Sequence, residues 1–188
     1  MSLDMVVVGK DQLDMLMPLI LEQQYDVGKE VDLASTRTFF EGIVGQETSF
    51  QIMAVEKGAA VGLVMIDPIP NLQFADNVAY VHDVYVTESL RGVRGIGAML
   101  VAAAFVESMR RGYEFAEGET SPDNRAARNL YSRMSKKLGI GCKEVDSVRL
   151  LVDLRPGIQR ARTEPGYLDQ LATPRLISRL GERPGADD

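Results

Sequence analysis

The spacing of apolar residues along the chain predicts an alternation of helices and strands. Helices are predicted where apolar residues recur with a period near 3.6, in segments that begin at Asp11, span residues 33–44 and span residues 96–110. Strands are predicted where short apolar runs are bounded by turn residues, over residues 5–8, 50–56, 59–67, 79–86 and 113–117, with a final strand or hairpin arm over residues 145–154. We expect Pro68 and Pro70 to end the third of these strands, since proline cannot donate to a sheet.

The order of these elements predicts an α/β fold (α+β mixed) with a mixed central sheet. A Lys57-Gly58 turn joins two neighbouring strands into a hairpin, so the N-terminal half of the sheet should be antiparallel. Residues 79–117 form a strand-helix-strand unit, whose two strands should lie parallel with a right-handed crossover. We therefore expect a sheet with an antiparallel N-terminal half and one parallel pair, flanked by helices.

The composition changes after residue 154. Residues 155–188 contain Pro-Gly pairs at 156–157, 165–166 and 184–185 and are otherwise largely polar. We predict one domain over residues 1–154 and a C-terminal tail over residues 155–188. Apolar residues of this tail are spaced so that they could form one short face: Leu168, Leu171, Leu176, Ile177 and Leu180. Such a face would dock on the domain or contact a second copy in a homodimer.

A glycine-rich segment separates the strand over residues 79–86 from the helix over residues 96–110. Its sequence is Arg91-Gly92-Val93-Arg94-Gly95-Ile96-Gly97-Ala98. Glycines allow the backbone to approach a ligand closely, and the following helix directs N–H groups and a positive dipole end at the same point. The segment therefore predicts an anion site that suits a pyrophosphate.

Other functions of this segment find less support in the sequence. A dinucleotide-binding fingerprint requires a third glycine where this chain has Leu100, and a nucleoside-triphosphate loop requires a lysine and a serine or threonine after its last glycine. A purely structural turn would explain the glycines. It would not explain the second motif that follows downstream.

The second motif is Asn124-Arg125-Ala126-Ala127-Arg128-Asn129-Leu130-Tyr131, which opens an amphipathic helix after a turn-like Ser121-Pro122-Asp123. Asn124 and Tyr131 are separated by about two helical turns, or about 10 Å along one face. Together the two motifs resemble those of the GNAT superfamily of N-acetyltransferases. The resemblance is strongest over residues 79–139, is weaker over residues 4–154 and does not cover residues 155–188.

The resemblance implies that the chain binds acetyl-CoA as a co-substrate. In that family the glycine segment has the form Arg/Gln-x-x-Gly-x-Gly/Ala and holds the pyrophosphate and pantetheine. Here Gly92 stands at the position of the arginine or glutamine unless Arg94 is an insertion, so either Arg91 or Arg94 could meet the phosphates, and we favour Arg91. The cofactor residues implied are Val84, Tyr85, Val86, Arg91, Gly92, Val93, Arg94, Gly95, Ile96, Gly97, Ala98, Asn124, Ala127 and Tyr131.

Acetyl transfer to an amine needs a base for the amine proton and an acid for the leaving thiolate. A lysine-like amine has a pKa of about 10.4 and arrives mostly protonated. The candidates for the base are His82, Asp83, Glu117 and Glu119, or a water molecule. Because His82 and Asp83 are adjacent on one strand, alternation predicts that only one of them lines the cleft. The resemblance implies that Tyr131 is the acid, since the family's tyrosine at this position commonly protonates the CoA sulfur.

Each of these residues also has a purely structural interpretation. Tyr131 could pack in the core, and Asn124 could only cap the helix that it begins. His82 and Asp83 could be polar groups satisfied within the sheet, and the glutamates could lie on a solvated rim. Three arginines of the second motif helix could form a solvated face or reach the 3′-phosphate of CoA: Arg125, Arg128 and Arg133.

The composition argues against several other classes of function. The net charge is −6 without a basic stripe, which argues against nucleic acid as a partner and suits a cationic substrate, although acidity also favours solubility. His82 is the only histidine and Cys142 the only cysteine, so we expect no metal site and no intrachain disulfide. No apolar run approaches the ~18 residues of a membrane span, and no secretory signal is evident. We expect a cytoplasmic protein.

The resemblance to the GNAT superfamily implies an N-acetyltransferase, and we expect it to act on a primary amine by direct attack in a ternary complex. The segment His82-Asp83-Val84-Tyr85-Val86 looks like the Glu-Asp-hydrophobic-hydrophobic-Val strand of diamine and polyamine acetyltransferases, with histidine in place of the first acid. This similarity favours a small cationic amine over a protein N-terminus or a lysine. A non-catalytic acyl-CoA-binding module, with the tail as a partner contact, is the alternative of a different class.

Overall fold

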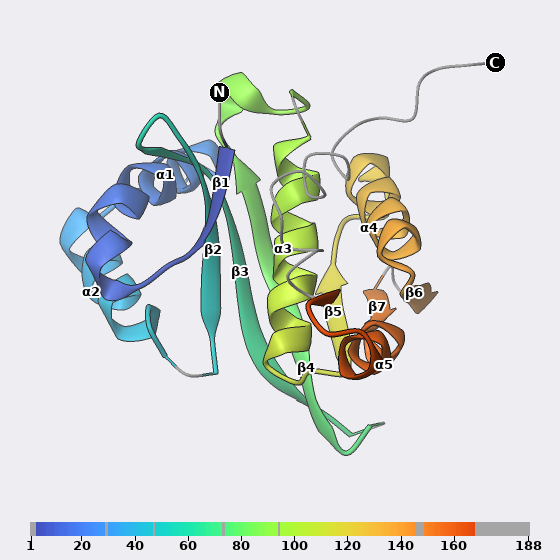
Figure 1. Cartoon of the computed structure of the whole chain (residues 1–188). Helices are drawn as coiled ribbons and strands as arrows, with labels where there is room; N and C mark the ends of the chain where they lie inside the picture. The colour runs from blue at the N-terminus through green and yellow to red at the C-terminus, as the bar shows by residue number, and fades with distance from the viewer. Residues whose placement is uncertain are drawn as a thin grey trace.

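A seven-stranded sheet with helices on both faces makes up the described part of the chain (Figure 1). The computed structural model describes residues 3–28, 30–46, 48–72, 74–93, 95–145 and 149–167. Its strands are β1 Leu3–Val7, β2 Phe50–Glu56, β3 Ala59–Asn71, β4 Asp76–Val86, β5 Phe115–Glu119, β6 Gly141–Val145 and β7 Arg149–Asp153. Its helices are α1 Leu13–Asp26, α2 Leu33–Ile43, α3 Ile96–Arg110, α4 Arg125–Leu138 and α5 Arg155–Thr163, with 3₁₀ turns at Lys10–Gln12 and Glu88–Leu90.

The strands lie in the order β1-β2-β3-β4-β5-β7-β6. All neighbours are antiparallel except β4 and β5, which pair in parallel from Ala79 with Ala116 to Val81 with Gly118. Helix α3 connects these two strands, as expected for a strand-helix-strand unit. The predicted mixed sheet, with its antiparallel N-terminal half and one parallel pair, is confirmed.

Two apolar clusters hold the helices on opposite faces of the sheet (Figure 1). On one face, α1 and α2 pack through residues such as Leu16 and Phe40. On the other face α3 is buried along nearly its whole length, and α4 lies beside it. Gly62 in β3 permits this close packing, because a Cβ there would lie 2.8 Å from Cδ1 of Leu100.

A bulge at His82 changes the alternation of β4. Pairing with β3 passes directly from Val81 to Asp83, so His82 is the extra residue. Val81 faces the cluster under α3 before the bulge, whereas Val84 and Val86 contact that cluster after it. The bulge interrupts the regular alternation of β4 at His82 and Asp83, and both side chains are exposed. A bulge of this kind also bends the strand and helps to separate it from its neighbour.

Strand β3 is longer than the sequence predicts. It continues through Pro68 and Pro70 to Asn71, although the prolines were expected to end it. Strand β2 stops opposite Ile66, so one edge of β3 has no strand partner beyond that residue among the described residues. A proline whose nitrogen faces an open edge removes no ladder hydrogen bond, which explains why both prolines are accommodated.

The C-terminal part of the sheet contains one strand that the sequence pattern conceals. Residues 145–154 were predicted as a final strand or hairpin arm, and β7 lies there, but the strand β6 that precedes it and pairs with it was not predicted. Strand β6 begins with Gly141 and contains Lys143 and Glu144, so it lacks the apolar run from which the other strands were predicted.

The described residues after 154 form a helix that packs on the domain. Helix α5 begins with a proline in its first turn, and a Cβ on Gly157 would lie 2.4 Å from the sulfur of Met109 in α3. Tyr167 is buried, and its hydroxyl donates to the carbonyl of Leu138 at 3.3 Å. The apolar face predicted at Leu168, Leu171, Leu176, Ile177 and Leu180 lies outside the described residues. None of the described helices is both long enough and apolar enough to cross a membrane.

Candidate active site

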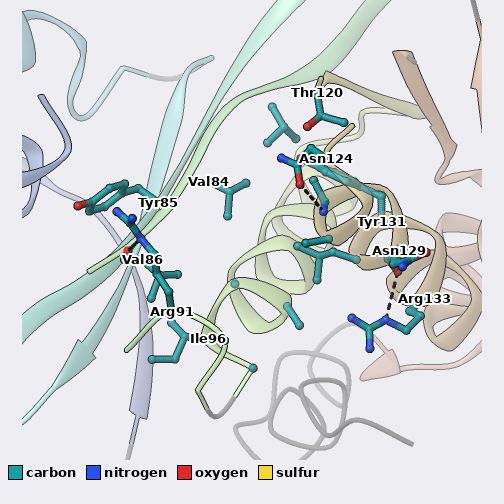
Figure 2. Close-up of a pocket in the computed structure, with 18 of the residues that line it drawn as sticks. Val84, Tyr85, Val86, Arg91, Ile96, Thr120, Asn124, Asn129, Tyr131 and Arg133 are labelled. Carbon is teal, nitrogen blue, oxygen red and sulfur yellow. Dashed lines mark hydrogen bonds between the residues drawn. The ribbon is translucent and has the colours of Figure 1, made fainter. Parts of the chain in front are cut away.

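A cleft of about 1200 Å³ opens where β4 and β5 separate. The parallel pairing of the two strands ends at Val81 and Gly118, while β4 continues to Val86. Figure 2 shows residues of β4 and the glycine loop on one side of the cleft and residues of α4 on the other. All of the predicted cofactor residues line it except Val93, whose side chain is exposed, and Arg94, which lies outside the described residues.

The glycine loop ends at the N-terminus of α3. Gly95 precedes the helix with a φ of 65°, in the left-handed region that favours glycine. Met99 N donates to Gly95 O, so the N–H groups of Ile96, Gly97 and Ala98 have no partner within the helix. A Cβ on Gly97 would meet only Cγ2 of Val86, at 3.9 Å, so packing within the described residues does not require glycine there. The open space beside this helix end fits an anionic group.

The edge of β4 that faces the cleft presents backbone groups. Thr87 N donates to Val61 O on the side of β3. Because backbone groups alternate along a strand, the N–H and C=O groups of Val84 and Val86 point away from β3, toward the cleft. They can hydrogen-bond to an extended ligand laid along the strand. In this structure Val86 O accepts a hydrogen bond from Nε of Arg91 at 3.0 Å.

Helix α4 supplies the opposite wall of the cleft. Asn124 caps this helix, and its Oδ1 accepts from Ala127 N at 3.0 Å, so the structural role considered for Asn124 is present. The cleft also has lining residues that the sequence reasoning missed: Val81, Thr120, Ala126, Asn129, Leu130 and Ser132. The helical period, extended from the second motif, could have identified those on α4. Arg133, considered for the 3′-phosphate, lines the cleft as well.

Tyr131 lies between the cleft and the core. Its side chain is buried, and its ring centroid lies 6.1 Å from that of Phe105. The hydroxyl lies beside Gly118 in β5, 3.4 Å from the position that a Cβ would occupy there. Burial is the main cause that raises the pKa of Tyr131 well above its usual range, and the nearby Tyr80 and Asp83 add to the effect. The phenol therefore stays protonated at neutral pH.

Of the two adjacent candidates for the base, His82 lines the cleft and Asp83 does not. His82 Nε2 lies 3.0 Å from Oδ2 of Asp67 on β3. Its ring also contacts that of Tyr80, with 4.7 Å between the centroids. These contacts orient the imidazole and leave its other nitrogen for a different partner.

The two candidate glutamates differ in environment. Glu117 is buried, and its Oε1 accepts from Nδ2 of Asn71 at 2.5 Å. Asn71 ends β3, and the nearby Phe74 stacks on Phe115 with 3.8 Å between ring centroids, so the β3–β4 connection folds over the start of β5. Glu117 does not line the cleft, whereas the exposed Glu119 at the end of β5 does.

Arg91 lines the cleft but forms its ion pair outside the glycine loop. Its guanidinium pairs with Asp26 on α1 and lies over the ring of Tyr85, 5.0 Å from the centroid. The hydrogen bond that Arg91 donates to Asp26 is the largest cause that raises the pKa of Arg91. Arg91, which we favoured as the phosphate ligand, is thus paired with the carboxylate of Asp26.

The family of the chain follows from comparison with known proteins. Residues 13–135 match the model of the acetyltransferase (GNAT) family. The matched range includes both the glycine segment and the second motif. No protein of curated function matches the chain in sequence.

Solved structures share the fold at low sequence identity. A probable acetyltransferase is 22% identical with a TM-score of 0.61, over 68% of this chain and 85% of that one. The ribosomal-protein-alanine N-acetyltransferase of Brucella melitensis biovar Abortus 2308 is 16% identical with a TM-score of 0.57, over 71% and 91%. The aminoglycoside N-acetyltransferase AAC(6')-Iy, in complex with CoA, is 20% identical with a TM-score of 0.59, over 70% and 86%. Since the family model covers more than half of the residues, the chain belongs to the GNAT family of acetyltransferases.

Proposed function

We propose that this protein uses acetyl-CoA to acetylate the primary amine of a small cationic molecule, by direct attack within a ternary complex. The reaction forms an amide bond, breaks the thioester and moves one proton from the amine to the sulfur. One observation carries the proposal: a single cleft gathers the free edge of β4, the N-terminus of α3, Asn124 and Tyr131. Acetyl-CoA would supply the activated acetyl group as a thioester.

The cofactor would be held mainly by backbone groups. The N–H groups of Ile96, Gly97 and Ala98, with the positive end of the α3 dipole, suit the pyrophosphate. The amides of the pantetheine arm would pair with Val84 and Val86 as an added strand. Arg133 on α4 is a candidate for the 3′-phosphate, because a guanidinium can bind phosphate through two hydrogen bonds.

Tyr131 is our candidate for the acid. Its hydroxyl lies next to Gly118, where β5 leaves β4 and the reacting end of the pantetheine arm would lie. A phenol that stays protonated at neutral pH can donate to a thiolate as the carbon–sulfur bond breaks.

His82 is our candidate for the base. It lines the cleft at the bulge, and Asp67 holds one of its ring nitrogens. The other nitrogen could then take a proton from the substrate ammonium, directly or through one water, which leaves the neutral amine to attack the thioester. Glu117 is the second candidate, although it accepts a hydrogen bond from Asn71 and does not line the cleft.

Carboxylates in and beside the cleft favour a cationic acceptor. Asp67 lies beside His82, Asp83 follows it on β4, and Glu119 lines the cleft at the end of β5. Negative charges at a cleft raise the local concentration of a cation. Some structural relatives are named as aminoglycoside acetyltransferases, which agrees with an acceptor of this class.

The test is release of free CoA thiol from acetyl-CoA against a panel of amines. The panel contains a diamine, a polyamine, an aminoglycoside, a lysine peptide and a peptide with a free N-terminus. We expect turnover with the small polycations and little with the peptides. Acetyl-CoA should also stabilise the fold by about 2.7 kcal/mol at a hundredfold excess over Kd.

Other results would select the alternatives. Stabilisation by acetyl-CoA without turnover of any amine would support a non-catalytic acyl-CoA-binding module. A preference for the peptides would support a protein acetyltransferase. Stabilisation by NAD and not by acetyl-CoA would contradict the cofactor assignment.

A further inference from the structure

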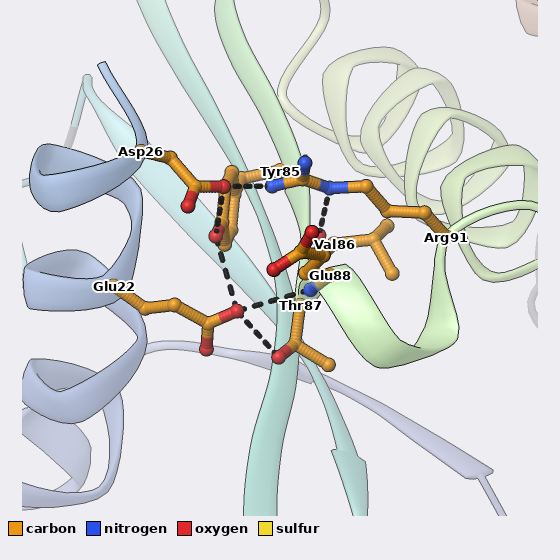
Figure 3. Close-up of polar contacts among 7 residues, drawn as sticks. All are labelled: Glu22, Asp26, Tyr85, Val86, Thr87, Glu88 and Arg91. Atoms are coloured by element: carbon orange, nitrogen blue, oxygen red, sulfur yellow. Dashed lines mark hydrogen bonds and ion pairs between the residues drawn. The ribbon is translucent and has the colours of Figure 1, made fainter. Parts of the chain in front are cut away.

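Glu22 on α1 holds the segment that leads into the glycine loop (Figure 3). Its Oε1 accepts hydrogen bonds from Thr87 Oγ1 at 2.6 Å and Glu88 N at 3.0 Å. It also lies 3.1 Å from Oη of Tyr85. Partial burial would raise the pKa of Glu22, but these three hydrogen bonds together lower it. The carboxylate is therefore charged at neutral pH and can accept all three bonds.

Asp26, one helical turn further along α1, holds the other end of the same segment (Figure 3). Its Oδ2 pairs with the Arg91 guanidinium and lies 2.9 Å from Oη of Tyr85. Arg91 in turn donates from Nε to Val86 O at 3.0 Å. Glu22 and Asp26, hereafter the carboxylate pair, thus contact both ends of residues 85–91.

The position of this segment decides where the glycine loop begins. Gly92 and Gly95 both have positive φ values, and glycine loses more conformational freedom on ordering than any other residue. Within the described part of the chain, the backbone–backbone hydrogen bonds of residues 87–93 are local turns, apart from the one that Thr87 N donates to Val61 O. The carboxylate pair therefore adds long-range anchors just ahead of a flexible sequence.

Neither carboxylate is placed to contact the cofactor itself. The lining of the cleft includes Arg91 but neither Glu22 nor Asp26. Both lie on the face of the sheet that α1 covers, whereas the start of α3 belongs to the cluster on the opposite face. Any effect of the carboxylate pair on the cofactor must therefore pass through residues 85–91.

We propose that Glu22 and Asp26 are positioning residues for acetyl-CoA, which fix residues 85–91 so that the N–H groups at the start of α3 meet the pyrophosphate. Arg91 contributes through Asp26 and Val86 and not as a direct phosphate ligand. The inference rests on the proposed use of acetyl-CoA. It extends the cofactor site to a helix that does not line the cleft.

The first experiment measures Kd for acetyl-CoA by calorimetry, with kcat and KM, for Glu22→Ala and Glu22→Gln. Removal of a charged hydrogen-bond acceptor should raise Kd about tenfold. Turnover at saturating acetyl-CoA should stay within about threefold of the wild-type rate, because the reacting groups are unchanged. Glutamine should restore most of the affinity, since its amide oxygen can still accept.

The second experiment is a double-mutant cycle with Asp26→Ala and Arg91→Ala. Each single variant should raise Kd for acetyl-CoA by a similar factor, and the double variant should be no worse than either. The control is Asp14→Asn, which removes a carboxylate of the same helix that pairs with Arg37 at 2.7 Å. This control should leave Kd unchanged, and circular dichroism should confirm that all variants are folded.

Three results would overturn the inference while wild-type protein still binds acetyl-CoA. Tighter binding by Asp26→Ala would mean that Asp26 competes with the pyrophosphate for Arg91. If Arg91→Ala weakened acetyl-CoA binding as much in the Asp26→Ala variant as in the wild-type protein, Arg91 would be a direct ligand of the cofactor. Unchanged affinity in folded Glu22→Ala would remove the positioning role. Wild-type protein without affinity for acetyl-CoA would instead contradict the proposed function on which the inference rests.

Discussion

At the scale of single residues, the proposed mechanism depends on Tyr131 as the acid that protonates the leaving thiolate. Replacement by phenylalanine keeps the ring contact with Phe105 and removes only the hydroxyl. We expect kcat to fall by about 10²-fold, the lower end for a lost general acid, because water can partly replace the donor. The Kd for acetyl-CoA should barely change. Both quantities are measured with the best amine, and an unchanged kcat would leave Tyr131 with a packing role alone.

Sequence reasoning places a residue at the cleft most reliably when the residues that share its role lie close to it in the chain. Asn124 and Tyr131 share one helix, so their spacing alone put both beside one cleft. The bulge at His82 depends on how β3 and β4 pair and has no local sequence signal. The contact of Arg91 with Asp26 joins residues that are 65 positions apart, and only the tertiary fold creates it.

At the scale of elements, the packing of α3 on β3 positions the start of the helix. A Cβ on Gly62 would lie 2.8 Å from Leu100 Cδ1 and 3.3 Å from Ile96 Cγ2, so it would push the first turns of α3 outward. We expect Gly62→Ala to lower the free energy of unfolding by about 1 to 3 kcal/mol, as overpacking does. It should also weaken acetyl-CoA binding, since Ile96 begins the helix whose N–H groups we assign to the pyrophosphate.

A matched control for Gly62→Ala exists in α2. Gly42 has no atom within 4 Å of the position that a Cβ would occupy. Gly42→Ala should therefore be neutral or stabilising by up to about 1 kcal/mol, because alanine favours a helix. Urea unfolding and calorimetry measure both variants. Equal stability of the two would contradict the close packing at Gly62.

Elements with strong apolar periodicity were predicted best. The bounds of α3 agree with the prediction, and β2 matches residues 50–56. The prolines of β3 are ambiguous in sequence, because their effect depends on whether the strand edge is paired. Strand β6 has few apolar residues, since its place at the end of the sheet requires pairing with β7 alone.

At the scale of the whole molecule, the C-terminal segment belongs partly to the core. Pro156 and Gly157 read as a loop in sequence, yet proline is accommodated in the first turn of a helix and glycine allows α5 to approach Met109. Tyr167 and Ile158 then add to the cluster that contains α3. Composition alone could not reveal this, because the partner surface forms only when the sheet and α3 are assembled.

Two truncations test how the C-terminal residues contribute to the domain. Removal of all residues after Leu154 deletes α5 and Tyr167, and the loss of one buried large side chain costs about 1.5 to 3 kcal/mol. We expect this variant to lose several kcal/mol of unfolding free energy, whereas a truncation after Tyr167 keeps α5 and Tyr167 and should lose less. Met109 lies near the end of α3 remote from Gly95, so folded molecules of either variant should bind acetyl-CoA with unchanged Kd.

Urea unfolding, light scattering and calorimetry measure these effects. Equal stability of the two truncations would mean that α5 is dispensable, and a loss of acetyl-CoA binding in the longer, folded variant would bring residues 168–188 into the site.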